Sequence, residues 1–323
     1  MALTRPVLPA DLTRVTTYPL ASRSNKVRVD EFARPVAASS SLGDFLDGLP
    51  DVLAVKALRE LAAAIVQARS EGHPVVVAAG AHVVKVGLAP VLIGMMEEGT
   101  ISAIALTGAG AIHDWEIAAI GATSEDVGRG LHDGRYGMAD ETGRALNDAA
   151  KEAAAEGAGL GEVLGRRIAG AALPQRAASL LARAFELDIP ATVHVAIGSD
   201  VVHQHPSADG AAIGAATFTD FRKLVTIVSS LSGGVWINLG SAVLLPEVFL
   251  KALSVAANLG SNLSGFATAN LDMVRHYRTD ENVLLRPTLG RGKSFSLTGH
   301  HELNVPLLAA AVGLERARRD SGR

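Results

Sequence analysis

The stretch from Pro74 to Glu116 constrains the fold more than any other part of the chain. Its first apolar run, residues 75–77, lacks polar alternation, which is typical of a parallel strand buried on both faces. A turn at Ala79-Gly80 leads to residues 88–98, where apolar side chains recur at helical spacing, and a second apolar run covers residues 101–106. The stretch therefore predicts one βαβ unit, with two parallel strands joined by a helix.

The same alternation of apolar runs and helical patterns continues along the chain. Strands are expected at residues 191–197, 234–239 and 265–269 and in a short run ending at Thr298, and helices at residues 52–69, 123–131, 141–157, 161–172, 175–187, 218–231 and 246–259 and from Pro306. This alternation favours an α/β fold with a mostly parallel sheet and helices on both faces. The length of 323 residues and the 33 glycines suit a single large, closely packed domain.

Both ends of the chain differ from this pattern. Residues 1–50 contain several prolines and show little periodicity, so we expect an extended N-terminal arm that lies over the domain or over a neighbouring subunit. The α/β domain is expected at residues 51–315. Residues 316–323 end in the sequence ARRDSGR and are expected to form a loose C-terminal tail.

The composition excludes several classes of protein. Cysteine is absent, which removes disulfides, thiolate catalysis and cysteine-ligated metal sites. The 30 Lys and Arg residues and 33 Asp and Glu residues give a net charge of −3, so no overall field favours nucleic acid or an anionic membrane. The first residues lack an apolar run of signal-peptide length, and no run of about twenty apolar residues follows. We therefore expect a soluble, cytoplasmic protein that binds neither nucleic acid nor membrane.

Glycine and polar residues follow four of the predicted strands. These clusters lie at residues 107–116, 198–210, 238–241 and 268–272. The carboxyl ends of parallel strands meet at one edge of a sheet, where open α/β folds bind their ligands. The sequence therefore predicts one composite site at this edge.

His113, Asp114 and Glu116 follow the second strand directly. A histidine beside two carboxylates in a crevice has the composition of a general base with its orienting group. The alternative is that both carboxylates only complement the amino terminus of a helix. Lys85, after the first glycine turn, either holds a phosphate or substrate carboxylate or is an ordinary solvated lysine.

Two histidine-rich segments offer a different chemistry. His203 and His205 are two residues apart, so on an extended segment they face the same way and can share zinc or manganese with Asp200 or with the cluster His300-His301-Glu302. The alternative is that they are polar loop residues. Lys293 lies in an RGK loop, where an anion contact is favoured over a role as nucleophile.

The order of the strand-end motifs resembles that of the deoxyhypusine synthase family, and more closely a branch of deoxyhypusine-synthase-like proteins. The resemblance runs from about residue 50 to about residue 312 and rests on the motifs LTGAGAIHDWE, SADGAAIG, WINLGSAVLLPEVFLKA, FATANLD and GHHELNVPLL. It implies a Rossmann-like sheet, a homotetramer built from tight dimers, and NAD held at the dimer interface. In the family, NAD takes a hydride from the carbon beside an amine of spermidine, and the butylamine portion passes to a lysine.

The resemblance also implies roles for individual residues. Residues that match the family's cofactor segments are Thr107, Ala109, Gly110, Asp209, Gly240 and Ser241. Asp114 stands where the family has a carboxylate and suits a ribose hydroxyl, while Thr268 and Asp272 match the segment that lines the cofactor and amine pocket. Asn270 lies within that segment and is assigned to substrate binding.

The chain departs from the family at three points. The interval LLRPTLGRGKSFSLTGHHE lacks the Trp-Gly-Lys that carries the family's nucleophilic lysine, and Lys293 lies too close to the last strand. The family's paired histidines are replaced by Leu245-Pro246-Glu247, and its Ala-Asp-Ala by Gly299-His300-His301. These departures argue against aminobutyl transfer to a protein lysine.

We therefore hypothesise an NAD-dependent enzyme of the deoxyhypusine synthase type that abstracts a hydride from a polyamine-like amine or another small polar metabolite. The predicted catalytic residues are His113, Glu116, His203, Lys293, His300 and His301, and the predicted substrate-binding residues are Lys85, His205, Asn270 and Glu302. One alternative is a metal-dependent hydrolase or lyase that uses Asp200, His203 and His205. Another is an assembly protein without catalytic activity.

Overall fold

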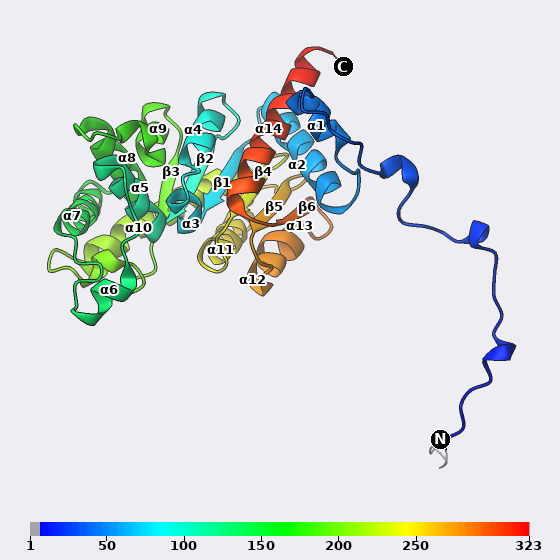
Figure 1. Cartoon of the computed structure of the whole chain (residues 1–323). Coiled ribbons are helices and arrows are strands. Elements are labelled where there is room, and N and C mark those ends of the chain that lie inside the picture. The colour runs from blue at the N-terminus through cyan, green and yellow to red at the C-terminus, as the bar shows by residue number, and fades with distance from the viewer. Residues whose placement is uncertain (1–6, 323) are drawn as a thin grey trace.

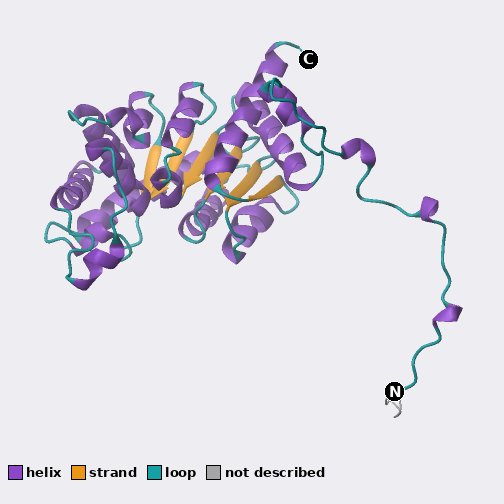
Figure 2. Cartoon of the chain, viewed as in Figure 1, coloured by secondary structure: helices purple, strands orange, loops and turns teal. Residues whose placement is uncertain are grey.

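The computed structural model describes residues 7–322 and contains one six-stranded parallel sheet (Figures 1 and 2). The strands are β1 (Val75–Ala79), β2 (Ala103–Thr107), β3 (Ala191–His194), β4 (Val235–Leu239), β5 (Ala267–Asp272) and β6 (Lys293–Thr298). Their order across the sheet is β3-β2-β1-β4-β5-β6, and every neighbouring pair is parallel. This is the strand order of dinucleotide-binding folds, so the expected Rossmann-like α/β fold is confirmed.

Helices cover both faces of the sheet (Figure 1). The α-helices are α1 (Leu42–Gly48), α2 (Leu53–Ser70), α3 (Ala81–Lys85), α4 (Ala89–Glu97), α5 (Gly108–Ile120), α6 (Val127–His132), α7 (Asp140–Glu156), α8 (Leu160–Gly170), α9 (Leu180–Glu186), α10 (Gly210–Ser229), α11 (Leu244–Asn258), α12 (Tyr277–Thr279), α13 (Arg286–Thr288) and α14 (His301–Asp320). A π-helical segment, η6 (Asp280–Leu285), joins α12 to α13, and 3-10 turns occur at η4 (Arg176–Ala178) and η5 (Val201–Gln204).

The alternation of side chains along β1 explains why its sequence is apolar throughout. Val75, Val77 and Ala79 pack in one hydrophobic cluster together with α2, α4 and α14. Val76 and Ala78 pack in a second cluster, on the other face, together with α11 and the later part of α10. A strand that is buried on both faces has no position for a polar side chain, which is why the run of valines predicted it correctly.

The outer edge of β3 is covered by side chains of α10. The Val193 N–H donates to Oδ2 of Asp220 over 2.9 Å, and the Val195 N–H donates to Oγ1 of Thr217 over 3.0 Å. Asp220 also accepts the N–H of Gly161 at the start of α8 over 2.9 Å. These bonds occupy the backbone donors that an edge strand otherwise offers to another chain.

Several segments differ from the sequence-based expectation, mainly in where they begin or end. The expected glycine turn at residues 107–111 is the first turn of α5, because the hydroxyl of Thr107 accepts the Gly110 N–H over 3.1 Å and begins the helix there. The helix expected at residues 123–131 begins at Val127, with Asp126 as its N-cap. The last helix, expected from Pro306, begins at His301.

The loose tail expected at residues 316–323 is largely helical. α14 continues to Asp320, and Arg316 and Arg318 form ion pairs with Glu98 and Asp47 over 2.7 Å and 2.6 Å. Residues 316–320 therefore belong to the domain. Arg323 lies outside the described residues.

The N-terminal arm leaves the body of the molecule and extends away from it (Figure 1). Residues 7–30 are exposed along their whole length and contain only short 3-10 turns, and residues 1–6 of the expected arm lie outside the described residues. Large apolar side chains lie open on the arm, including Leu8, Tyr18 and Val29 at 81%, 67% and 79% exposure. Residues 7–30 therefore do not lie over the domain, whereas α1, within the expected arm, packs on it through the buried Leu46.

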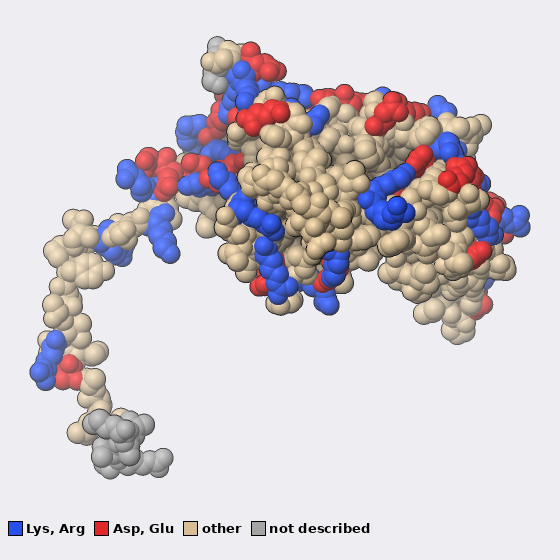
Figure 3. All heavy atoms as spheres, turned by 180° about the vertical axis from the view of Figure 1, so that it is seen from behind, with Lys and Arg blue, Asp and Glu red and all other residues tan. Residues whose placement is uncertain are grey.

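No helix within residues 7–322 is long and apolar enough to cross a membrane. On the face of the molecule seen in Figure 3, uncharged residues cover most of the surface, and small groups of basic and acidic side chains interrupt it.

Candidate functional site

At the carboxyl edge of the sheet, the chain leaves the neighbouring strands β1 and β4 toward opposite faces, and we call this point the fork. After β1 the chain enters α3 and α4 on one face of the sheet, and after β4 it enters α11 on the other face. In open α/β sheets this divergence marks the ligand-binding crevice.

Two glycines bring the backbones together at this fork. The Gly80 N–H donates to the carbonyl of Leu239 over 2.8 Å, and a side chain on Gly80 would collide with the carbonyl of Gly240. Gly240 has a φ of 60°, and a side chain there would collide with the imidazole of His301. Both positions therefore require glycine, the first for close approach and the second also for its left-handed backbone.

Asp272 and His301 lie together at the fork. Oδ1 of Asp272, the last residue of β5, is 3.9 Å from Nε2 of His301, the first residue of α14. The two side chains are 10% and 1% exposed, respectively, yet Oδ2 of Asp272 and Nδ1 of His301 have no hydrogen-bond partner. Buried polar atoms in native proteins are rarely left unpaired, so the pair has capacity for a polar ligand. Burial lowers the pKa of His301, although the neighbouring Asp272 carboxylate acts in the opposite direction.

Further histidines surround this pair. Nε2 of His276 lies 3.9 Å from the other carboxylate oxygen of Asp272, and the ring of His82 lies 5.7 Å from the ring of His301. His300 and Glu302 are more exposed, and their side chains approach each other to 3.8 Å. The structure thus brings the predicted residues Asp272, His300, His301 and Glu302 to one place, together with the unpredicted His82 and His276.

A row of buried polar side chains leads along β4 and β5 toward Asp272. Asn238 donates to the side-chain oxygen of Asn270 over 2.7 Å and to the carbonyl of Ser241 over 3.0 Å. Oδ1 of Asn238 and the hydroxyl of Thr268 are buried without a partner. Ser241 accepts the Leu245 N–H over 3.1 Å, which anchors the start of α11. These contacts place the predicted residues Asn270, Gly240 and Ser241 on the same side of the fork as Asp272, whereas Thr268 pairs with Ser294 near the amino ends of β5 and β6.

His113 and Glu116 form a second group on α5. The hydroxyl of Thr123 lies 2.6 Å from Nδ1 of His113 and donates to Glu116, which also accepts from the hydroxyl of Thr142 over 3.1 Å. Since Thr123 gives its only proton to Glu116, it must accept one from Nδ1 of His113, which leaves Nε2 of the neutral imidazole as an acceptor. Burial lowers the pKa of His113, and Lys85 acts in the same direction while Glu116 opposes it.

Asp200 occupies the amino end of α5. A side chain on Gly108 would collide with its carboxylate, and a hydrogen bond from the Ala109 backbone partly offsets the rise in the pKa of Asp200 caused by burial. His203 accepts the N–H groups of Gly198 and Asp200 over 3.1 Å and 3.3 Å. The start of α5 therefore already carries a carboxylate of the chain itself.

Three predicted site residues have other partners. Asp114 is fully buried and accepts from the Ser179 hydroxyl and the Leu180 N–H over 2.5 Å and 2.7 Å, which fixes the start of α9. His205 is bound through Nε2 to the carbonyl of Gly137 over 2.7 Å. Asp209 accepts the first N–H groups of α10 and acts as its N-cap. In this arrangement Asp114 is fully buried against the start of α9 and is not open to a ribose, and His205 is turned toward Gly137.

Lys293 lies at the opposite edge of the sheet. It is the first residue of β6, whereas the candidate site adjoins the end of that strand at Thr298. A six-residue strand spans roughly 16 to 20 Å, so Lys293 is too far from Asp272 to act there. Its assignment as a catalytic residue is corrected on this ground, while Lys85 is exposed on α3 near His113.

Within residues 7–322, no three His, Asp or Glu side chains are arranged to hold a metal ion. The set Asp200, His203 and His205 is not brought together, because His205 is turned toward Gly137.

Two of the residues that sequence reasoning missed carried little signal. His82 is a lone histidine two residues after the first glycine turn, and Thr123 is one of several threonines outside any motif. Only the position of His82 after a predicted strand, at the edge where ligands bind, could have drawn attention to it.

The residues at the fork fit a dinucleotide such as NAD. The strand order and the divergence of α3 and α11 to opposite faces are the features of a sheet edge that binds a dinucleotide. The unpaired atoms of Asp272 and His301 lie at the same place. The start of α5 fits a cofactor phosphate less well, because Asp200 already provides the negative charge there.

Comparison with solved structures finds several proteins of similar fold. A putative deoxyhypusine synthase from Entamoeba histolytica is similar over 84% of this chain and 93% of its own, with 12% identity and a TM-score of 0.50. ArgZ, an arginine dihydrolase from the ornithine–ammonia cycle of cyanobacteria, is similar over 81% of this chain and 33% of its own, with 16% identity and a TM-score of 0.50.

AgrE, in a ternary complex with ornithine and NAD+, is similar over 84% of this chain and 35% of its own, with 14% identity and a TM-score of 0.51. The chain thus spans about a third of the length of ArgZ and AgrE. No protein-family model and no curated protein sequence matches it. At these identities the likeness establishes a shared fold.

Proposed function

We propose that this chain is an NAD-dependent enzyme that acts on a polyamine-like amine at the fork between β1 and β4. The observation that carries the proposal is the pair Asp272 and His301, which is buried at the fork with one unpaired polar atom on each partner. A carboxylate beside a histidine at the edge of a nucleotide-binding sheet suits the removal of a proton from a cationic or hydroxylated substrate. The similar folds of a putative deoxyhypusine synthase and of AgrE, which binds ornithine and NAD+, agree with this assignment.

Each residue of the pair has a distinct role in this proposal. The Asp272 carboxylate attracts the ammonium group of the substrate and orients the carbon next to it. Burial lowers the pKa of His301, so its imidazole is neutral at pH 7 and can accept the proton that the substrate amine releases. NAD, bound against Gly80, Gly240 and Ser241, would supply the hydride acceptor.

Transfer of the substrate's alkylamine group to Lys293 is not part of the proposal. Lys293 lies at the amino end of β6, and an acceptor at the fork has to come from a second molecule. Hydride abstraction with release of the oxidised product is the reaction that the residues at the fork support by themselves.

We also propose that copies of this chain associate through the carboxyl edge of the sheet, as dimers that form a homotetramer. Exposed apolar side chains follow several strands at this edge, among them Ile197 after β3, Val243 after β4, Met273, Val274 and Tyr277 after β5, and Leu303 after β6. Exposed apolar groups that cluster around a functional edge are typical of a subunit contact. The apolar N-terminal arm supplies a further surface for a neighbouring copy.

Calorimetry of NAD binding, followed by a screen of diamines and polyamines for a change in nicotinamide absorbance, tests the function. We expect saturable NAD binding and amine-dependent reduction of NAD. Asp272→Asn and His301→Gln should retain NAD binding and lose turnover, whereas Asp209→Asn, which changes an exposed helix cap, should retain both. Absence of NAD binding at millimolar concentration, or full turnover by Asp272→Asn, contradicts the proposal.

A further inference from the structure

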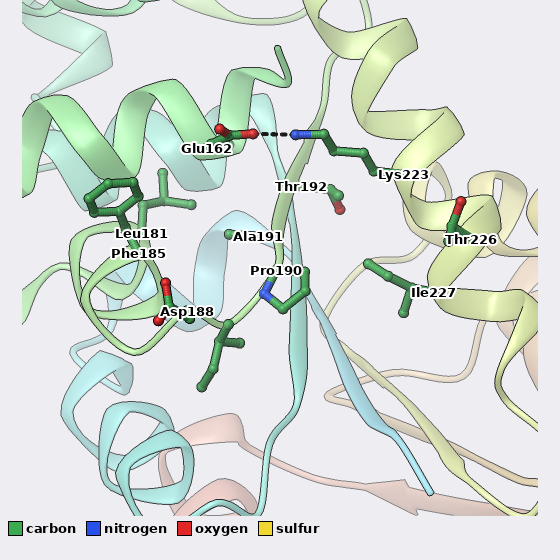
Figure 4. A pocket seen from close by; sticks show the side chains of 12 residues that line it. Glu162, Leu181, Phe185, Asp188, Pro190, Ala191, Thr192, Lys223, Thr226 and Ile227 are labelled. Carbon is green, nitrogen blue, oxygen red and sulfur yellow. Dashed lines mark hydrogen bonds and ion pairs between the residues drawn. The ribbon is translucent and has the colours of Figure 1, made fainter.

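A separate pocket lies at the end of β3 opposite the candidate site (Figure 4). Its volume is about 460 Å³, within the range of small-molecule sites. Pro190 and Ala191 at the start of β3 form its floor, and α8, α9 and the later part of α10 form its walls. None of its lining residues belongs to the fork at β1 and β4.

Glycines on α8 shape the walls of this pocket. A side chain on Gly161 would collide with the backbone of Ala191, and one on Gly165 would approach the backbone carbonyl of Leu181 too closely. α8 therefore packs directly against β3 and α9. The pocket opens where α9 and α10 separate beyond this contact.

Most of the lining is apolar. Leu181, Phe185 and Ile189 come from α9 and the turn that follows it, and Ile227 faces them from α10. Phe185 is 41% exposed, so one part of its ring remains open to a ligand. A pocket of this kind accepts an aliphatic or aromatic body.

The charges around the pocket favour a cation. Lys223 and Glu162 form an ion pair along one side and neutralise each other, whereas Asp188 on the other side has no ion-pair partner among residues 7–322 (Figure 4). Asp188 follows the carboxyl end of α9, and Thr226 lies near the carboxyl end of α10. Helix carboxyl ends carry partial negative charge, which adds to the charge of Asp188.

Asp188 occupies a backbone position that usually belongs to glycine. Its φ is 55°, and the Ile189 N–H donates to the carbonyl of Ala184 over 2.8 Å, as in a helix end closed by a left-handed residue. A side chain at such a position costs conformational energy that glycine avoids. Asp188 is itself exposed and follows Phe185 by three residues. A carboxylate and an aromatic ring that line one pocket can together bind an ammonium group.

We propose that this pocket binds a small organic amine with an apolar body, whose ammonium group contacts Asp188 and the ring of Phe185. The site is distinct from the fork that carries Asp272, so it binds a second molecule and does not replace the proposed substrate site. Its ligand class is a protonated monoamine of the size of phenethylamine.

Titration of the methyl groups of Leu181, Ile189 and Ile227 by NMR tests this proposal, with phenethylamine, L-phenylalanine and phenylacetate as probes. We expect saturable shifts of these methyl signals with phenethylamine, weaker binding of the zwitterion, and none with the anion. Asp188→Asn and Asp188→Gly both tolerate the left-handed backbone, and each should weaken binding by about tenfold or more. Glu186→Gln, a neighbouring exposed carboxylate outside the pocket, is the matched control and should leave the affinity unchanged.

The remaining outcomes separate this pocket from the proposed active site. Asp272→Asn should retain the phenethylamine shifts, because that residue belongs to the fork. Thr226 lines the pocket from the exposed side of α10, so Thr226→Trp should fill the pocket and abolish the phenethylamine shifts. Equal binding of phenylacetate, unchanged affinity in both Asp188 variants, or methyl shifts confined to other parts of the protein would overturn the proposal.

Discussion

The carboxylate of Asp272 and the imidazole of His301 approach each other to 3.9 Å, although β5 and α14 contribute them separately. Two backbone features hold them there. The Gly299 N–H donates to the carbonyl of Asp272 over 2.9 Å, which extends the ladder between β5 and β6 beyond the strands. Gly240 lacks a side chain and leaves room for the imidazole. The pair is therefore fixed by the sheet edge itself.

We expect His301 to titrate below the ordinary histidine pKa of 6.5, because burial disfavours its charged form. Asp272 opposes this effect, so Asp272→Asn should lower the pKa of His301 further. Since the neutral imidazole is the base, turnover should be lost as the pH falls through that pKa. Proton NMR of the imidazole signals measures both values. The signal of His301 is the one that disappears in His301→Gln, and His300→Gln, which changes an exposed neighbour, is the control. An unchanged or raised pKa in Asp272→Asn contradicts the expectation.

The buried carboxylate of Asp220 should make stability decrease as the pH rises. Burial raises its pKa from 3.8 to about 7, so the folded state holds a proton that the unfolded state has lost over this interval. Asp220→Asn removes this titration and should gain stability relative to the wild type from pH 4 to pH 7, by at most about 4 kcal/mol. Urea unfolding at a series of pH values measures the difference. A constant difference across the series would show that Asp220 is charged in the folded state throughout.

The contact between Gly80 and Gly240 should not tolerate a methyl group. A side chain on Gly80 would collide with the backbone of Gly240, so we expect Gly80→Ala to destabilise the protein by about 1–3 kcal/mol. Gly94 lies within α4 with open space around it, and Gly94→Ala should stabilise the protein by about 0.5–1 kcal/mol. Urea unfolding distinguishes the two variants. Equal changes in the free energy of unfolding would contradict the close contact between Gly80 and Gly240.

The strands and most helices were predictable because their patterns are local. A parallel strand that is buried on both faces has to be an apolar run, as in residues 75–77, and α2 and α11 repeat their apolar positions at helical spacing. Helix starts were less predictable. The sequence LTGAGA reads as a turn because of its glycines, but the hydroxyl of Thr107 begins a helix within it.

The candidate site was only partly predictable, because its residues meet through tertiary contacts. Asp114 and Asp272 both follow predicted strands. Asp114 binds the start of α9, 66 residues away in the sequence, whereas Asp272 faces the fork. Nothing local distinguishes these two environments. Lys293 was assigned to the site because it stands near the position of the family's nucleophilic lysine, but β6 separates it from the histidine cluster by its whole length.

The hydroxyl of Thr123 should fix the tautomer of His113. It donates to Glu116 and therefore accepts from Nδ1 of the imidazole. In Thr123→Val the Nδ1 proton loses this acceptor, so we expect the Nε2-protonated tautomer to become the major form. Nitrogen-15 NMR of the imidazole measures the tautomer ratio directly. Thr142→Val removes the other donor to Glu116 without touching His113 and serves as the control, and a Thr123→Val protein with an unchanged ratio contradicts the assignment.

The proposed subunit contact can be tested with two exposed leucines at opposite edges of the sheet. Leu303 lies in the first turn of α14 beside the candidate site and is 66% exposed, while Leu259 follows the carboxyl end of α11 at the far edge and is 73% exposed. Leu303→Glu places a charge in the proposed contact without harming the fold, since a negative charge is favourable at a helix amino end. We expect it to shift the protein toward monomers in analytical ultracentrifugation, whereas Leu259→Glu should leave the assembly unchanged. Equal sedimentation of the two variants would contradict an association through the carboxyl edge. The site would then be complete within one chain.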